Sequence, residues 1–135
     1  MNDITKYYTN KLTLSTDRAY VFIIKFDLYD SDDFVGILST DEINRSNEMR
    51  SLKKRTQFII TRGITKKILA TYLNRNPTQI EFFYNRYGKP FINDKYNDYV
   101  IEFNTSHSEL YGLIAITLNS KIGVDIQKVK PLQNI

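Results

Sequence analysis

The chain of 135 residues contains no cysteine and only one histidine. The absence of cysteine excludes a disulfide framework, a thiolate zinc site and a cysteine nucleophile. The sequence also lacks an uninterrupted apolar run of about 18 residues, the length that spans a bilayer. Residues 1–18 do not contain the apolar stretch of a secretion signal. We therefore expect a cytoplasmic protein with no membrane partner.

The residues that are present favour one folded domain. Apolar residues make up 41% of the chain and aromatic residues 13%, which is enough for a core at this length. Residues 1–19 are polar with little periodicity and are predicted to form an N-terminal arm. Residues 20–131 are assigned to a single domain and residues 132–135 to a truncated linker.

The net charge of +4 is unevenly distributed. Residues 27–42 contain six acids and no bases, whereas residues 45–75 contain nine bases and one acid. A local positive field of this kind suits nucleic acid, an acidic protein or a polyphosphate ligand. A solvated helix face is the simpler interpretation. Because Phe58 and Tyr72 are the only aromatic residues there, base stacking is disfavoured and no nucleic-acid partner is expected.

Two helices are predicted in the first half of the chain, after a strand at 20–28. Ser39 and Glu42 form a capping box that starts a short helix. A long helix is predicted from about residue 51 to residue 74, because apolar and basic residues recur there with helical spacing. One face carries Ile60, Ile64 and Ile68, and the opposite face carries a basic stripe of Arg55, Arg62 and Lys66.

The second half of the chain has the period of strands. Alternation predicts strands at 79–84, 90–93, 99–105, 111–118 and 122–129, with turns at 85–88 and 119–120. A strand, two helices and then several strands indicate an α+β domain with helices on one face of a mostly antiparallel sheet. The order is compatible with a ferredoxin-like arrangement.

Two clusters are candidates for an anion site. His107 follows a strand and lies between Ser106 and Ser108, so hydroxyls, backbone N–H groups and an imidazolium could donate to phosphate oxygens. In the segment 87–90, Gly88 permits a turn and a proline fixes the backbone after it, which holds Lys89 at a defined point. An exposed histidine and an ordinary hairpin turn with a solvated lysine are the alternatives.

A third cluster is a candidate for a cation site. Strand alternation places Asp125 and Gln127 on one side of the segment 122–127, where their oxygens could face a hard cation together. One carboxylate and one amide hold magnesium only when substrate phosphates and waters complete the octahedron. A half-buried strand with a polar outer face is the alternative for this segment.

Three motifs follow one another along the chain: GKP at 88–90, FNTSHS at 103–108 and GVDI at 123–126. Their order and spacing resemble the 4′-phosphopantetheinyl transferase superfamily, specifically the N-terminal half of its long, surfactin-synthetase-activating type. The resemblance covers residues 38–131 and includes LSTDEINR at 38–45 and the helix RTQFIITRGITKKILATYL at 55–73.

The resemblance implies a fold and an activity. Members of this superfamily move the 4′-phosphopantetheine arm of coenzyme A onto a serine of an acyl or peptidyl carrier protein, and magnesium neutralises charge on the leaving phosphate. By position, the resemblance implies that Asp125 and Gln127 bind the metal. The residues that it implies for coenzyme A binding are Arg55, Tyr87, Gly88, Lys89, Pro90, Ser106 and His107.

Two features depart from the family pattern. Gln127 stands where long-type members often carry a glutamate that also binds magnesium. The sequence up to Ile135 contains no W-x-x-K-E-A motif, which belongs to the second half of long-type members. We therefore expect a homodimer or a complementary second-half chain to complete the site. An inactive remnant that binds coenzyme A or a carrier protein without catalysis is the alternative.

Overall fold

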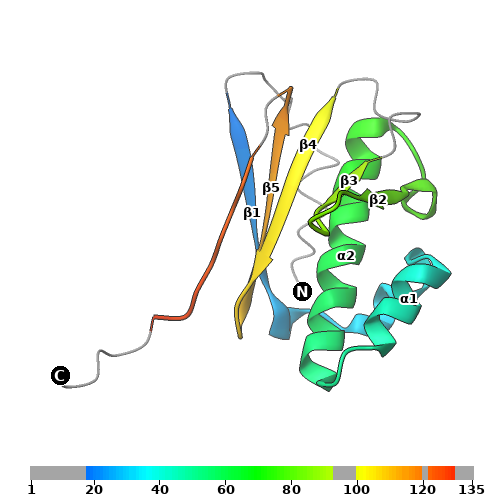
Figure 1. Ribbon diagram of the computed structural model, residues 1–135, viewed down its shortest axis with the longest axis vertical. Coiled ribbons are helices and arrows are strands. Elements are labelled where there is room, and N and C mark those ends of the chain that lie inside the picture. Colours follow the sequence, from blue (N-terminus) through cyan, green and yellow to red (C-terminus); the bar gives the residue numbers. More distant parts are fainter. Residues whose placement is uncertain (1–17, 93–99, 120–121, 130–135) are drawn as a thin grey trace.

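The computed structural model describes residues 18–92, 100–119 and 122–129 (Figure 1). Strand β1 (Ala19–Lys25) is followed by three short 3-10 turns, helix α1 (Thr40–Asn47) and helix α2 (Leu52–Leu73). After them come β2 (Phe82–Tyr84), β3 (Pro90–Ile92), β4 (Ile101–His107) and β5 (Tyr111–Leu118). In these described stretches, no helix is both long enough and apolar enough to cross a membrane.

The strands form a three-stranded antiparallel sheet in the order β1-β5-β4 and a separate antiparallel hairpin, β2–β3. In Figure 1, α2 lies along one side of the sheet, and α1 packs on the side of α2 that is remote from the sheet. The hairpin adjoins β4. The predicted α+β architecture, with helices on one face of a mostly antiparallel sheet, is confirmed.

The core lies between the sheet and α2. Alternate residues of the three strands point toward the helix and are buried, as the period of a strand requires. The helix contributes Ile60, Ile64 and Ile68, none of which is exposed to solvent. Their partners from the sheet are Phe22, Ile24, Ile101, Phe103, Ile114 and Ile116.

The helix ends follow the sequence signals. Ser39 Oγ accepts a hydrogen bond from Glu42 N at 3.2 Å, and Glu42 Oε1 accepts one from Ser39 N at 3.0 Å, so the predicted capping box is present. At α2, Ser51 Oγ accepts from Lys54 N at 3.2 Å. The helix ends at Asn74, which adopts a left-handed φ of 52°.

Three predicted strands have wrong boundaries. The strand predicted at 99–105 continues to the end of β4, so His107 is the last residue of a strand and does not follow one. The strand predicted at 20–28 ends at Lys25, because residues 26–28 form a 3-10 turn whose first N–H donates to the carbonyl of Leu110. The strand predicted at 79–84 begins only at Phe82. Asn76 and Pro77 start a capped 3-10 turn before it. The arm predicted at 1–19 is too long by its last residue, because β1 already begins at Ala19. Residues 1–17 of that arm, the linker at 132–135 and Ser120 lie outside the described residues.

The predicted basic stripe of α2 is also wrong as an exposed surface. The Lys66 side chain is 2% exposed and that of Arg62 is 11% exposed. Both are paired with Glu42 of α1. Because α1 and the hairpin cover the side of α2 that faces away from the sheet, these two cations are internal. Both interpretations of the stripe, a solvated helix face and an open anion-binding surface, are therefore wrong for Arg62 and Lys66.

Tyr72, on α2, is partly buried and its hydroxyl is shielded from solvent. Burial, and after it the neighbouring Tyr20, raises the pKa of the Tyr72 phenol to about 12. Because a tyrosine of the unfolded chain ionises near the ordinary pKa of 10.0, this group stabilises the fold below about pH 10. That contribution is lost as the pH rises toward 12.

A glycine on α2 permits close approach of the chain that precedes α1. A Cβ added at Gly63 would lie 2.6 Å from the Cβ of Phe34, a residue that is only 3% exposed. We expect Gly63→Ala to lower the free energy of unfolding by about 1–3 kcal/mol despite the better helix propensity of alanine. Urea unfolding measures this loss. Gly36→Ala is the control, because a Cβ there meets no atom within 4 Å; equal midpoints for the two variants would contradict the packing argument.

Candidate functional site

The turn between β2 and β3 is held by its first residue. Asn85 N donates to Lys89 O at 3.0 Å, and Gly88 N donates to Asn85 O at 2.9 Å. The Asn85 side-chain oxygen accepts from the backbone N–H groups of Tyr87 and Lys89 at 2.9 and 3.0 Å. Gly88 has a φ of 82°, a conformation that favours glycine. The turn predicted at 85–88 is therefore confirmed, and it fixes the backbone of Lys89.

The Lys89 side chain contacts the first residue of the last described segment, 122–129. Lys89 Nζ donates to the carbonyl oxygen of Ile122 at 3.4 Å. An ammonium group has three donors, so this contact leaves others for an anion. Tyr87, in contrast, is 78% exposed, and its hydroxyl accepts from Arg86 at 2.6 Å. The structure therefore places Lys89 beside the segment that carries the predicted cation ligands.

The strand predicted at 122–129 is wrong, because this segment has no backbone ladder. It is held instead by side chains of β4 that point away from α2. Val124 N donates to Asn104 Oδ1 at 3.2 Å, and Ile126 N donates to Ser106 Oγ at 3.1 Å. The segment thus lies against the outer face of the sheet and leaves it on the side away from α2 (Figure 1).

Asp125 is oriented by two further hydrogen bonds. Ser106 Oγ donates to Asp125 Oδ1 at 3.1 Å, and Gln127 Nε2 donates to Asp125 Oδ2 at 3.0 Å. Asp125 and Gln127 therefore lie on one side of the segment, as alternation predicts. The amide nitrogen of Gln127, rather than its oxygen, faces the carboxylate. Ser106 joins β4 to Asp125, while its predicted contact with coenzyme A stays a prediction.

His107 faces a hollow that Gln127 also lines. This hollow has a volume of about 540 Å³ and is bounded by His107, Ser108, Glu109, Ile126, Gln127 and Lys128. Glu109 and Lys128 close one side of it with an exposed ion pair of 3.0 Å. The structure thus brings the histidine motif and the segment 122–129 to one concave surface.

The start of α2 adjoins the same region. Gln57 Nε2 donates to the carbonyl of Glu109 at 2.8 Å, two residues after His107. A second hollow of about 640 Å³ is lined by Lys53 and Thr56 of α2 together with Glu109. Arg55 lies on this first part of the helix, and its Nε is buried without a partner among the described residues.

Three contributors to this surface were missed by the sequence analysis. Asn104 holds the segment 122–129, and its outward position in the alternation of 101–107 was the signal that could have found it. Thr56 and Gln57 follow Arg55 directly, so the sequence could have predicted that they lie near the basic first part of the helix. The hydrogen bond of Gln57 to the turn after His107 could not be predicted from the sequence.

The residues at Asp125 fit a metal in a limited way. Across 18–92, 100–119 and 122–129, no group of three or more His, Asp or Glu side chains could hold an ion by itself. Each Asp125 oxygen accepts one hydrogen bond and keeps a second lone pair. Magnesium is often bound by one or two carboxylates, with waters and substrate phosphates as its other ligands. Asp125 fits that pattern as a single carboxylate ligand.

Comparison with known proteins identifies the relatives of the chain. It is 33% identical over 126 residues to the 4′-phosphopantetheinyl transferase HetI of Nostoc sp., an alignment that covers 92% of this chain and 53% of HetI. The chain is homologous to 4′-phosphopantetheinyl transferases. It is also 36% identical over 69 residues to the transferase gsp of Aneurinibacillus migulanus, covering 51% of the chain and 27% of gsp.

A further relative extends the same finding. The chain is 32% identical over 98 residues to the putative 4′-phosphopantetheinyl transferase slr0495 of Synechocystis sp., which covers 73% of this chain and 39% of the relative. No protein-family model matches the sequence. The chain spans about half the length, or less, of the curated transferases that it matches.

Proposed function

We propose that the chain takes part in transfer of the 4′-phosphopantetheine group from coenzyme A to a serine of an acyl or peptidyl carrier protein. The observation that carries this proposal is the convergence of three motifs. Lys89 contacts Ile122 at the start of the segment 122–129, and Ser106 contacts Asp125 within it. Groups suited to phosphate and to a divalent cation therefore meet at one surface.

In the proposed reaction, the carrier serine oxygen bonds to the phosphorus that bears the pantetheine arm. The bond from that phosphorus to the pyrophosphate bridging oxygen breaks, the serine proton is released and 3′,5′-ADP leaves. Magnesium, when bound, neutralises charge on the pyrophosphate. Lys89 and His107 hold phosphate oxygens of coenzyme A, together with Arg55, and Asp125 orients the metal from a carboxylate fixed by Ser106.

We propose that a second copy of the chain or a complementary second-half chain completes the site. Val21 and Ile23 point to the outer face of the sheet from its edge strand β1 and are 50% and 61% exposed. Apolar side chains grouped on an exposed sheet face favour association.

The alternative function is binding of coenzyme A or a carrier protein without transfer. The Gln127 amide supports it, because this side chain adds no negative charge beside Asp125 and donates its nitrogen to the carboxylate. The test is incubation of the chain with apo carrier protein, coenzyme A and magnesium, followed by mass spectrometry of the carrier. A mass gain of one phosphopantetheine group supports transfer. Coenzyme A binding with no mass gain supports the alternative.

We further propose that Lys89 and His107 act on the 3′-phosphate of coenzyme A, which predicts a ligand preference. We expect Lys89→Ala and His107→Ala each to weaken coenzyme A binding about tenfold or more, since a charge-assisted hydrogen bond contributes about 1.5–3 kcal/mol. The same variants should lose less affinity for dephospho-coenzyme A, which lacks the 3′-phosphate. Calorimetric titration of both ligands measures the difference.

Lys54→Ala is the matched control for this prediction, because Lys54 is an exposed lysine on the first turn of α2. Its affinity for both ligands should stay close to that of the parent chain. Equal losses for coenzyme A and dephospho-coenzyme A in the Lys89 and His107 variants would move these residues to the pyrophosphate instead.

A further inference from the structure

A charged cluster joins α1 to α2 next to the hairpin that carries Lys89. Glu42 of α1 accepts hydrogen bonds from Lys66 Nζ and from Arg62 Nη1, the latter at 3.3 Å. The Glu42 side chain is only 7% exposed and that of Lys66 only 2%. Water therefore screens these charges little, and the geometry of the three groups is tightly constrained.

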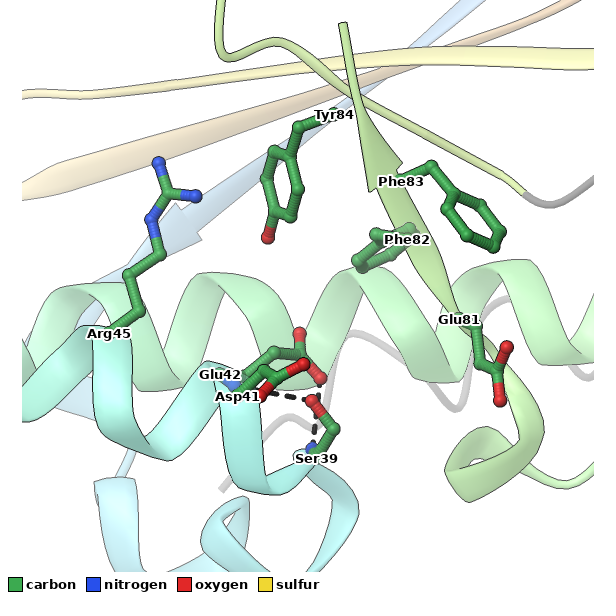
Figure 2. Close-up of a pocket in the computed structure, with 8 residues that line it drawn as sticks. All are labelled: Ser39, Asp41, Glu42, Arg45, Glu81, Phe82, Phe83 and Tyr84. Atoms are coloured by element: carbon green, nitrogen blue, oxygen red, sulfur yellow. Dashed lines mark hydrogen bonds between the residues drawn. The ribbon is translucent and has the colours of Figure 1, made fainter.

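The cluster continues into the hairpin through a tyrosine. The same Arg62 nitrogen that contacts Glu42 also donates to the Tyr84 hydroxyl at 2.6 Å. The Arg62 guanidinium lies over the rings of Phe58 and Phe82, 4.9 Å from each centroid, and over Tyr84 at 5.6 Å. Arg45 of α1 lies over the Tyr84 ring at 4.7 Å. Figure 2 shows Tyr84 pointing its hydroxyl from β2 toward the helices, with the Arg45 side chain beside the ring.

Tyr84 stands at the base of the Lys89 turn. It is the last residue of β2, and its cross-strand partner is Pro90, the residue directly after Lys89. The turn 85–89 therefore leaves and re-enters the hairpin at the Tyr84–Pro90 pair. The position of Tyr84 relative to α2 therefore sets the position of the Lys89 backbone, from which the side chain extends to Ile122.

The hairpin needs such an anchor. It has only three residue pairs, and an isolated two-stranded hairpin is at best marginally stable in water. Phe82 anchors it to β4 through a ring contact with Phe103 at 5.1 Å. The hydrogen bond from Arg62 to Tyr84 supplies an anchor to α2 at the end of β2 that leads into the turn.

We propose that Arg62 and Tyr84 are positioning residues for the Lys89 turn. Arg62 is fixed by Glu42 and by the surrounding rings, and it holds the Tyr84 hydroxyl so that Lys89 faces the segment 122–129. The role of Lys89 toward coenzyme A rests on the proposed function. The mechanical link from Arg62 to the turn does not, and it is measurable in the free protein.

The first experiment uses Tyr84→Phe, which removes the hydroxyl and keeps the ring. Backbone order parameters from NMR relaxation of Gly88 and Lys89 should fall from the rigid value of about 0.85 toward about 0.6. Those of α2 residues such as Leu69 should stay unchanged. Arg62→Lys should reproduce the loss of order, because an ammonium does not reproduce the planar stacking of the guanidinium. Unchanged order parameters at Gly88 and Lys89 in Tyr84→Phe would overturn the proposal.

The second experiment is a double-mutant cycle on coenzyme A binding. Tyr84→Phe should weaken binding about three- to tenfold in the parent chain and have no further effect in a Lys89→Ala background, because coupled residues are non-additive. Arg45→Gln is the control, because it removes a cation–π contact with the same ring and keeps the hydrogen bond from Arg62 to the Tyr84 hydroxyl. Its affinity for coenzyme A should stay close to that of the parent chain. Additive effects would overturn the proposal. Absence of coenzyme A binding by the parent chain counts against the proposed function of this chain on its own, and the order parameters then decide the positioning role alone.

Discussion

Replacement of Asp125 by alanine is expected to abolish the magnesium dependence of coenzyme A binding. Asp125 is the one carboxylate in the segment 122–129, and Ser106 and Gln127 orient it from both oxygens. Loss of a partner outside the direct metal ligands often lowers metal affinity 10–100-fold, so loss of the ligand itself should exceed about a hundredfold. Calorimetry with and without magnesium measures the change.

A neighbouring carboxylate provides the control for this prediction. Glu109 lines the hollow beside Gln127 but is paired with Lys128, and both side chains are more than half exposed. Glu109→Ala should leave the magnesium dependence intact, because an exposed ion pair contributes little. Coenzyme A affinity that responds to magnesium equally in Asp125→Ala and in the parent chain would contradict the assignment of Asp125.

The largest loss of stability is expected from Glu42→Ala. This change leaves Lys66 and Arg62 buried without their carboxylate, and breaking a buried ion pair from one side typically costs about 3–5 kcal/mol. It also removes the capping box with Ser39, a further contribution of about 1 kcal/mol. Chemical denaturation measures the free energy of unfolding. A loss below about 1 kcal/mol would contradict the argument that the cluster is desolvated.

Two further variants distinguish the stability lost by leaving a buried charge unpaired from the stability lost by removing a side chain of α1. Asp41→Ala removes an exposed acid from the same turn of α1 and should change stability by no more than about 0.5 kcal/mol. Glu42→Ala combined with Lys66→Met should be less destabilising than the sum of the two single changes, because the double variant removes one of the stranded charges. Additivity of the two losses would indicate that Lys66 and Glu42 do not interact across α1 and α2.

The stability prediction and the binding prediction test different parts of one arrangement. Glu42 holds Arg62, which in our proposal holds Tyr84 below the Lys89 turn. Asp125 lies at the other end of that path, against Ser106 of β4. A variant such as Tyr84→Phe, with the fold intact and the turn loosened, therefore distinguishes the positioning of Lys89 from the stability of the domain.

Local sequence signals determined the helices and the tight turn. Ser39 and Glu42 cap α1 because both partners lie three residues apart, and Asn85 and Gly88 form the turn because an Asx side chain and a left-handed glycine suffice for it. The spacing of Ile60, Ile64 and Ile68 predicted α2 and its core face. These features depend on residues close in sequence, so they were readable without the fold.

Each motif of the candidate site could also be identified from the sequence by itself. The sequence singled out Lys89, Ser106, His107 and Asp125 as chemically suited to phosphate or a cation. Which of them meet depends on contacts between residues distant in the chain. Lys89 lies 33 positions before Ile122, and Ser106 lies 19 positions before Asp125.

The sequence by itself determined the α+β class, the caps and the candidate motifs of this protein. The tertiary structure decided which charges are internal. The sequence pattern predicts a basic surface at Arg62 and Lys66, but α1 and the hairpin cover both side chains and Glu42 pairs with each of them. The tertiary structure also decided that the segment 122–129 is held by Asn104 and Ser106 without a strand ladder. Periodicity reports which side of an element a residue occupies, whereas burial and pairing depend on what packs against that side.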